Sequence, residues 1–508
     1  MNPRARVTAL ERQSDSLCRD CVAWFDVTDI FDFITSNSSV TGIQRVVAQL
    51  LTQLAPSDLG SLSAGENVVP IGASRWIGRI VLCQYDLDRH EYVVIPHDRF
   101  SATLKEFMAP SGKPKSLPRR AGWARLRKTA ISLIPKPIRP NRFRTNPTAA
   151  PAGDGSDACR FQSGDVFVLP GSFWFRPFHV NVILSVCHAY KMQLAVLVHD
   201  LIPIRCPTWF PARYVAAWSS AIGLILRSAD VVLTPSSYSA GDIRTFYREA
   251  GIAEPKIAML RYGETTSRLA ALESAAACAE RVRRYVSPGY VLMVSSIDRR
   301  KNQQLLIKVW QRLHAKYGAA TPYLVLIGKP ATDADSVLQS LRDCDFVQRH
   351  IVLLGDVDDT ELAAFYGGAL FTVFPSRAEG WGLPVSESLF HGKVCIAANS
   401  WSIPEVAGDL VEYFDPDDVD GCYALVERYC FDHDARRACE QRICTGYRPT
   451  DWAETARALI GVLDQLVADA NGPSSADATL GGGAHTYPRH VPPARIGRID
   501  NATGYTVP

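Results

Sequence analysis

Two carboxylates in the second half of the chain stand eight positions apart around a small turn. The segment Phe374–Leu389 reads FPSRAEGWGLPVSESL, in which Glu379 and Glu387 flank Gly-Trp-Gly and Pro384 suits the first turn of a helix. Backbone N–H groups at a turn into a helix can bind an anion, because the helix N-terminus favours negative charge. A carboxylate further into the helix can accept hydrogen bonds from sugar hydroxyls. The pattern predicts a binding site rather than a pair of solvated side chains.

A second segment supplies positive charge. Ser295–Asn302 reads SSIDRRKN and follows the apolar run Tyr290–Val294. Arg300 and Lys301 there could neutralise a leaving diphosphate. A solvated basic helix start is the alternative. Basic residues at that position oppose the helix dipole, which favours an anionic partner.

Two motifs in the first half leave their roles open. His199-Asp200 closes the apolar run Leu194–Val198, and a histidine in that place is most often a hydrogen-bonded core residue. Thr41-Gly42-Ile43-Gln44-Arg45 precedes an apolar-periodic helix, so Thr41 could simply be its N-cap. Position alone decides neither case.

Short apolar runs, separated by helical patterns, recur through the chain and could form the strands that position these residues. We expect strands in the first half at 24–27, 165–169, 194–198 and 231–234, and in the second half at 290–294, 323–327, 351–354, 370–374, 394–397 and 410–414. Alternating strands and helices predict parallel sheets with right-handed crossovers. The fold class is therefore α/β, with two Rossmann-like domains and ligand bound between them at the carboxyl ends of the strands.

Composition agrees with an enzyme of two domains. The chain has 508 residues, 47% of them hydrophobic, and a formal net charge of +3, which gives no reason to expect nucleic acid as a partner. No signal peptide and no membrane-spanning run are evident, and the scattered cysteines suit a reducing cytoplasm. Cys18 and Cys21 form a lone C-x-x-C without a second pair, which is weak support for zinc or redox chemistry.

The Glu379–Glu387 string resembles the Glu-x7-Glu signature of retaining glycosyltransferases, in particular glycosyltransferase family 4 with its GT-B fold. The basic segment is similar to that family's Glu-Pro-Arg-Lys-Asn segment, although Asp298 and Arg299 replace its Glu and Pro. His199-Asp200-Leu201-Ile202-Pro203 resembles its His-Asp-Leu-x-Pro segment. The resemblance covers roughly residues 22 to 465.

The resemblance implies a role for each matching residue. His199, Arg300, Lys301 and Glu379 would be catalytic: His199 and Glu379 face the donor sugar, and the two cations face the departing diphosphate. The donor would also be bound by the turn Gly380, Trp381, Gly382 and Leu383, and its ribose by Glu387. In that family the Gly-containing loop matched by 41–45 faces the donor phosphates and acceptor, and the donor is a co-substrate, so we expect no cofactor.

We expect an acceptor-side domain at 22–275, a donor-binding domain at 276–450, a helix at 451–470 that packs back on the first domain, and a disordered tail at 471–508. The style of the first half resembles bacterial mannosyltransferases of exopolysaccharide and lipopolysaccharide assembly. We therefore expect a cytoplasmic retaining hexosyltransferase that moves mannose from GDP-mannose to a glycan or lipid-linked acceptor. The alternatives are a nucleotide-sugar epimerase of the same fold and a catalytically silent protein that binds a nucleotide sugar.

Other readings of the chain are weaker. Asp86-Leu87-Asp88 could be a metal-binding D-x-D, but it lacks partner carboxylates, so we expect a surface turn and a metal-independent reaction. No G-x-G-x-x-G links a strand to a helix before the tail, which disfavours a dehydrogenase. A proline-rich insert, 107–153, holds eleven Lys or Arg and no Asp or Glu. Within it, residues 111–144 could dock on an anionic membrane from the inner face, or form a surface loop.

Overall fold

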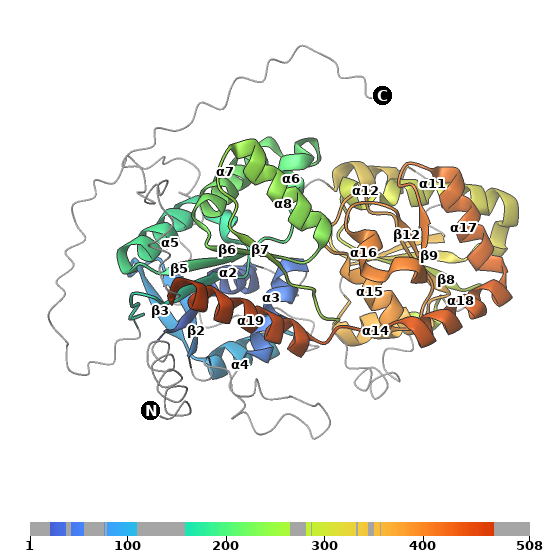
Figure 1. Ribbon diagram of the computed structural model, residues 1–508. Helices are drawn as coiled ribbons and strands as arrows, with labels where there is room; N and C mark the ends of the chain where they lie inside the picture. The colour runs from blue at the N-terminus through green and yellow to red at the C-terminus, as the bar shows by residue number, and fades with distance from the viewer. Residues whose placement is uncertain are drawn as a thin grey trace, which may run out of the picture.

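A computed structural model shows two α/β lobes side by side (Figure 1). The structure describes residues 21–36, 42–54, 76, 79–108, 158–264, 281–285, 287–331, 334–343, 350–355 and 357–471. Most of the basic insert, the tail after residue 471, Thr41, Cys18 and most of the region between the lobes, 265–280, lie outside the described residues.

The first lobe is built on a seven-stranded sheet of order β3-β2-β1-β4-β5-β6-β7. Its strands are β1 (Ala23–Asp26), β2 (Ile80–Asp86), β3 (Glu91–Ile95), β4 (Val166–Leu169), β5 (Gln193–Leu197), β6 (Val231–Thr234) and β7 (Lys256–Met259). Its helices are α2 (Thr28–Ser36), α3 (Gly42–Gln53), α4 (His97–Met108), η2 (Phe173–Phe175), α5 (Pro177–Tyr190), α6 (Ile202–Arg205), η3 (Pro207–Trp209), α7 (Ala212–Ser228) and α8 (Ser237–Ala250).

The second lobe has a six-stranded sheet of order β10-β9-β8-β11-β12-β13, in which every pairing is parallel. Its strands are β8 (Tyr290–Val294), β9 (Tyr323–Ile327), β10 (Ile351–Leu354), β11 (Phe371–Phe374), β12 (Cys395–Ala398) and β13 (Glu412–Phe414). Its helices are η4 (Arg299–Lys301), α11 (Gln303–Tyr317), η5 (Gly318–Ala320), α12 (Asp335–Arg342), α14 (Asp359–Gly368), α15 (Leu383–Phe390), α16 (Ile403–Ala407), η6 (Gly408–Leu410), α17 (Val419–Phe431) and α18 (His433–Gly446).

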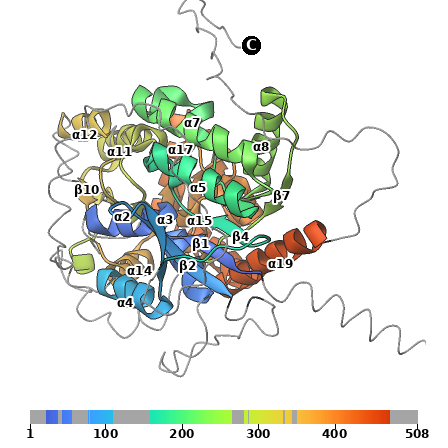
Figure 2. The same cartoon turned by 90° about the vertical axis from the view of Figure 1, so that its left-hand side faces the viewer.

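Both faces of each sheet are covered, which explains why the strands are apolar throughout. Successive residues of β1 point to opposite faces: Phe25 packs in the core under α2 and α3, and Trp24 packs in the core under α5 and α7. Figure 2 shows the same two layers of helices above and below the first sheet. Each strand expected from the sequence is present, with bounds that agree to within about two residues, whereas β2, β3 and β7 were not expected.

One part of the first sheet differs from the parallel arrangement that we expect from the sequence. Strands β2 and β3 pair antiparallel, with Asp86 opposite Glu91. The chain between them is a tight turn, so Asp86-Leu87-Asp88 lies at the end of a hairpin. Its β2 strand mixes buried and half-buried positions because β3 forms the edge of the sheet.

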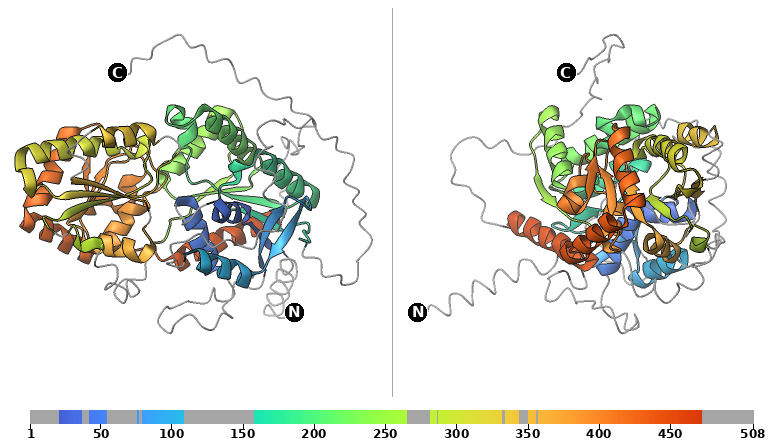
Figure 3. Two further views of the ribbon diagram at one scale, coloured as in Figure 1. Left: turned by 180° about the vertical axis from the view of Figure 1, so that it is seen from behind. Right: turned by 90° about the vertical axis from the view of Figure 1, so that its right-hand side faces the viewer.

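A last helix, α19 (Trp452–Asn471), returns to the first lobe and packs on α3. Trp76 Nε1 donates a hydrogen bond to Asp464 Oδ1 of this helix at 2.6 Å. Figure 3 shows from behind how the two lobes adjoin and how the helix lies against the first one.

Strand order marks where a ligand would bind in each lobe. In both sheets the order reverses between the first strand and the fourth, which are β1 and β4 in the first lobe and β8 and β11 in the second. Open α/β sheets bind ligands in the crevice outside the carboxyl ends of strands at such a switch point. The two Glu and the two cations singled out by the sequence follow β8 and β11.

Candidate active site

The loop after β8 presents the two cations. Asp298 caps the short helix η4 by accepting a hydrogen bond from the Lys301 backbone N–H at 3.1 Å. Asn302 then adopts a left-handed conformation with φ of 62°, and its Nδ2 donates to the Pro375 carbonyl at 3.2 Å. These contacts hold the loop after β8 against the loop after β11.

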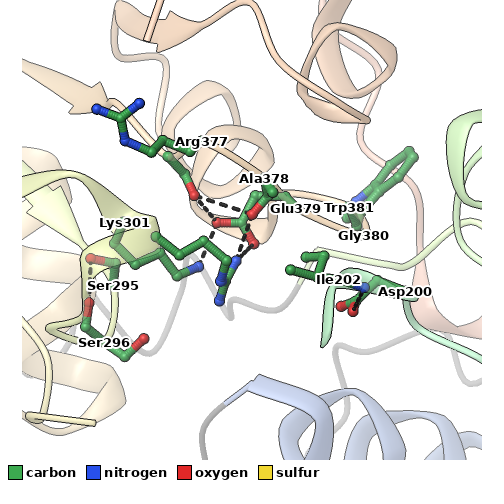
Figure 4. A network of polar contacts seen from close by, with 12 residues as sticks. Asp200, Ile202, Ser295, Ser296, Lys301, Arg377, Ala378, Glu379, Gly380 and Trp381 are labelled. Atoms are coloured by element: carbon green, nitrogen blue, oxygen red, sulfur yellow. Dashed lines mark hydrogen bonds and ion pairs between the residues drawn. The ribbon is translucent and has the colours of Figure 1, made fainter. Parts of the chain in front are cut away.

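Glu379 forms ion pairs with both cations, and Figure 4 shows Lys301 beside its carboxylate. Lys301 Nζ lies 2.5 Å from Glu379 Oε1, and Arg300 Nη1 lies 2.9 Å from Glu379 Oε2. Ser376 Oγ also donates to Oε1, at 2.5 Å. Arg300 Nη1 donates further to the Ala378 carbonyl at 2.6 Å. The structure thus brings three of the sequence-predicted residues into one cluster.

Burial and charge set the protonation of this cluster. Burial alone would raise the pKa of Glu379, but Arg300 and Lys301 lower it to about 2. Burial lowers the pKa of Lys301 and Arg300 lowers it further, while Glu379 opposes both effects. The carboxylate therefore stays ionised, and two cations face one anion in a site able to receive a further negative charge.

Burial decides between the alternatives that the sequence left for these charged residues. Neither the cations nor the glutamates form the solvated helix start considered as the alternative. Lys301 is only 9% exposed, Glu379 8% and Glu387 6%. Replacing Lys301 or Arg300 should therefore affect folding as well as chemistry, because Glu379 would lose a partner inside the protein.

The turn 380–382 lies against the first lobe. A Cβ on Gly380 would come within 2.1 Å of the His199 carbonyl oxygen, so the close approach requires glycine. Ser236 Oγ, at the end of β6, donates to the Gly380 carbonyl at 2.9 Å. Ser402 Oγ donates to the carbonyls of Glu379 and Trp381 at 2.7 and 2.9 Å. Gly382, with φ of 122°, then leads into α15, where Leu383 and Pro384 open the helix.

Glu387 lies apart from the Glu379 cluster, inside α15. It accepts a hydrogen bond from Tyr366 Oη at 2.8 Å, and Arg45 of the first lobe reaches it with Nη1 at 3.5 Å. Arg45 Nη2 also pairs with Asp359 at 3.4 Å. Burial raises the pKa of Glu387, although Arg45 and Tyr366 oppose that effect. The two glutamates thus face different partners.

Sequence reasoning missed these partners of Glu387. Arg45 belongs to the segment 41–45 noted as similar to the family's loop, but the structure places it in the first turn of α3. Nothing in its local sequence indicates a contact with residues more than 300 positions later. Tyr366 lies in α14 and shows no pattern beyond an apolar helix face. Only the tertiary fold brings them together.

His199 sits at the carboxyl edge of the first sheet, with its ring turned toward its own lobe. Nδ1 lies 2.5 Å from Tyr262 Oη and Nε2 lies 3.3 Å from the Pro170 carbonyl. The carbonyl can only accept, so Nε2 carries the proton and Nδ1 accepts from the tyrosine. Burial lowers the pKa of His199 to about 4, which leaves the imidazole neutral near pH 7. Its backbone, rather than its ring, makes the contact with Gly380.

Asp200 is a first-lobe carboxylate within electrostatic range of Arg300 and Lys301. Burial raises its pKa, and Arg300 of the second lobe opposes the effect. Asp200 Oδ1 accepts a hydrogen bond from Ile202 N at 3.0 Å. Figure 4 shows Asp200 on the side of Gly380 away from Lys301.

The remaining candidates lie elsewhere. Asp86 Oδ1 accepts from the backbone of Asp88 and Arg89 in the hairpin turn. Within the described ranges, no group of three or more His, Cys, Asp or Glu is placed to hold a metal ion. Over the same ranges, no helix combines the length and apolarity needed to cross a membrane. Cys18 and residues 111–144 lie outside the described part of the chain.

A family of known proteins matches the second lobe. The sequence profile described as Glycosyl transferases group 1 matches residues 279–443. The O-antigen chain mannosyltransferase B of Escherichia coli is 30% identical over 282 residues, which are 54% of this chain and 72% of that protein. The chain belongs to the group 1 glycosyltransferases.

One further relative by sequence and one solved structure are also similar to this glycosyltransferase. The serotype-specific mannosyltransferase WbdA of Escherichia coli is 26% identical over 178 residues, 35% of this chain and 22% of that protein. The sucrose-phosphate synthase of Thermosynechococcus elongatus has a TM-score of 0.53 over 89% of this chain and 100% of that chain, at 15% identity. The glycosyltransferase therefore has the GT-B fold, with two Rossmann-like domains that face each other.

Proposed function

We propose that this glycosyltransferase is a retaining hexosyltransferase that takes mannose from GDP-mannose. The observation that carries the proposal is the cluster of Arg300, Lys301 and Glu379 at the switch point of the second sheet. Two fixed cations there can stabilise the negative charge that develops on a departing diphosphate. The Glu379 carboxylate holds them in place and can accept hydrogen bonds from the donor sugar.

The remaining donor contacts follow from the fold. The backbone N–H groups of Gly380–Leu383 open α15 and can bind phosphate oxygens. Glu387 is one to two turns further and would accept hydrogen bonds from the ribose after the donor displaces Arg45. We assign donor binding to 276–450 and acceptor binding to 22–275. The mannosyltransferase names of the two relatives support mannose as the sugar and a surface polysaccharide as the product.

We propose that the reaction is metal-independent and cytoplasmic. Arg300 and Lys301 supply the positive charge that a divalent cation would otherwise bring. Buried thiols such as Cys395 suit a reducing compartment.

Product analysis tests the proposal. The protein is incubated with GDP-mannose and short α-mannosides in the presence of EDTA, and the new linkage is examined by NMR. We expect a mannosyl product of α-configuration, at a rate that the chelator does not change. A β-linked product would exclude retention, and a rate restored by Mn²⁺ or Mg²⁺ would exclude metal independence. Turnover of the donor to another nucleotide sugar without acceptor would instead identify an epimerase.

Membrane docking by residues 111–144 is also a proposal. Its basis is the basic, proline-rich composition of that segment and the need to meet a lipid-linked acceptor. Deleting 111–144 should abolish cosedimentation with anionic vesicles at low salt and leave donor binding intact. An intact protein that fails to bind such vesicles would show that docking is wrong.

A further inference from the structure

An exposed aromatic side chain lies on the first lobe, near the carboxyl end of β4. Phe175, in the short helix η2 directly after β4, is 63% exposed. Its ring centroid lies 6.5 Å from that of Tyr214 in α7, and Tyr214 stacks on Phe210 at 5.7 Å. We call Phe175, Phe210 and Tyr214 the aromatic wall. Phe175 is exposed and the other two rings are half-buried, so together they form a partly accessible aromatic surface that can pack against a ligand.

The wall lies next to the charged centre. The Tyr214 hydroxyl is influenced by Asp200 of its own lobe and by Arg300 of the other lobe, so it lies within electrostatic range of both. Asp200 is in turn coupled to Arg300 and Glu379. The packing agrees, because α7, which carries Tyr214, contacts both η2 and α6, the helix that follows Asp200, so the aromatic wall and Asp200 lie on neighbouring elements of the first lobe.

Asp200 has a spare acceptor. Among the described residues its hydrogen-bond partner is Ile202 N, which uses Oδ1. Oδ2 is left to accept from an incoming hydroxyl. Figure 4 shows this carboxylate on the segment that faces Gly380 and Glu379.

The fold holds the wall in place before any ligand arrives. Strand β4 and β1 form the switch point of the first sheet, where a ligand crevice is expected. The loop that carries Phe175 is tied down because Ser172 N donates to Asp29 at 2.7 Å and Arg176 pairs with Asp32 at 2.5 Å. Gln44 Nε2 also donates to Ser172 Oγ at 3.1 Å. The exposed ring is thus presented on a rigid support.

We propose that the aromatic wall is the acceptor subsite and binds one sugar ring of the acceptor glycan, with Asp200 Oδ2 accepting a hydrogen bond from an acceptor hydroxyl. This inference rests on the proposed function. A sugar fits because its C–H face packs on aromatic rings while its hydroxyls need a nearby acceptor. A lipid phosphate fits less well, because the Asp200 carboxylate would repel it.

Saturation-transfer NMR with α-mannobiose and no donor tests the subsite. We expect binding to the wild type, a weakening of about tenfold in Phe175→Ala and Tyr214→Ala, and a similar loss in Asp200→Asn. Tyr190→Ala is the matched control, because Tyr190 is 41% exposed at the far end of α5. The control should bind like the wild type. Since Phe175 is exposed, its replacement should leave the melting temperature unchanged.

Several outcomes would overturn the subsite. They are equal binding by Phe175→Ala and wild type, no binding of α-mannobiose by the wild type, and loss of anionic-vesicle binding alone in Phe175→Ala. Calorimetry of the same variants with GDP-mannose separates this result from the proposed function. Donor binding that persists while saccharide binding fails refutes the subsite alone, whereas a wild type that binds the saccharide and no donor refutes the proposed donor.

Discussion

At the scale of single residues, Glu379 organises the centre because both cations and Ser376 reach its carboxylate. The charges are fixed by short contacts inside the protein, so the proposed function would require little rearrangement of them when a diphosphate binds. Preorganised charge of this kind contributes most to transition-state stabilisation. Because of the same contacts, replacing any member of the cluster should lower the stability of the fold.

The Lys301→Ala variant tests whether the buried Lys301 ammonium acts in the reaction, whereas its exposed neighbour Arg299 does not. We expect Lys301→Ala to lower turnover by roughly 10²- to 10³-fold, the usual loss for a transition-state charge contact. The melting temperature should also fall, because Glu379 loses a buried partner. Arg299→Ala is the control, since Arg299 is the exposed neighbour, and should stay within a few-fold of wild type. Turnover of Lys301→Ala within a few-fold of wild type would contradict the assignment.

Alanine variants of the two glutamates should lose different activities. Glu387→Ala should weaken binding of free GDP, because a ribose contact forms with or without the sugar. Glu379→Ala should keep GDP binding and lose sugar transfer. Calorimetry with GDP and rate measurements on both variants distinguish the roles. If both variants bind GDP as the wild type does, the ribose role of Glu387 is wrong.

Asp29 should make stability depend on pH. Burial raises the pKa of Asp29 to about 7, with the carboxylates of Asp26 and Asp32 adding to the effect. An unfolded aspartate titrates near about pH 4, so the folded state binds the extra proton between about pH 4 and 7. Stability should fall as pH rises through that window. Asp29→Asn should therefore melt higher than wild type at pH 8 and close to it at pH 5. If the difference in melting temperature between variant and wild type is the same at pH 8 and pH 5, Asp29 does not carry a proton in the folded protein.

At the scale of elements, strand ends decide where chemistry is possible. The loops after β8 and β11 meet because these two strands are neighbours in the sheet. Loops after β1 and β4 meet in the first lobe for the same reason. The position of each charged group therefore depends more on the order of the strands in the sheet than on the residues next to it in the chain.

Sequence patterns predicted the parallel strands well, because strands buried on both faces are continuous apolar runs. The Glu379–Glu387 string and Arg300-Lys301 were identified because their spacing is local. The β2–β3 hairpin was missed, since an edge strand has a mixed pattern, and β7 was missed because its residues are only partly buried. Arg45 and Tyr366 could not be found, because their link to Glu387 depends on tertiary contacts.

Gly380 offers a test of the contact between lobes. A Cβ there would meet the backbone of His199 at 2.1 Å, and backbone atoms cannot move aside as a side chain can. Gly380→Ala should therefore lower transfer at least about tenfold, because small displacements at a reacting centre are costly. Gly367→Ala in α14, where a Cβ would meet nothing within 4 Å, is the control. Equal rates for the two variants would show that the close approach is unimportant for transfer.

At the scale of the whole molecule, several contacts join the lobes without a ligand. Glu405 of the second lobe accepts from the backbone N–H groups of Ser237 and Tyr238 at 2.7 and 2.6 Å, at the start of α8. Arg45 pairs with Glu387, and α19 returns to the first lobe. Under the proposed ribose role of Glu387, donor binding would compete with Arg45 for this carboxylate and would couple occupancy of the nucleotide site to the position of the first lobe.

Calorimetric titration with a panel of nucleotide sugars tests the central claim most directly, namely that the switch point of the second sheet is a nucleotide-sugar site. Wild type and Lys301→Ala are titrated with GDP-mannose and with UDP-linked and other GDP-linked sugars. We predict that wild type binds GDP-mannose in preference to the others and that Lys301→Ala binds it at least about tenfold more weakly, the loss of one charge-assisted contact. Failure of every nucleotide sugar to bind, or equal affinity of wild type and Lys301→Ala, would contradict it.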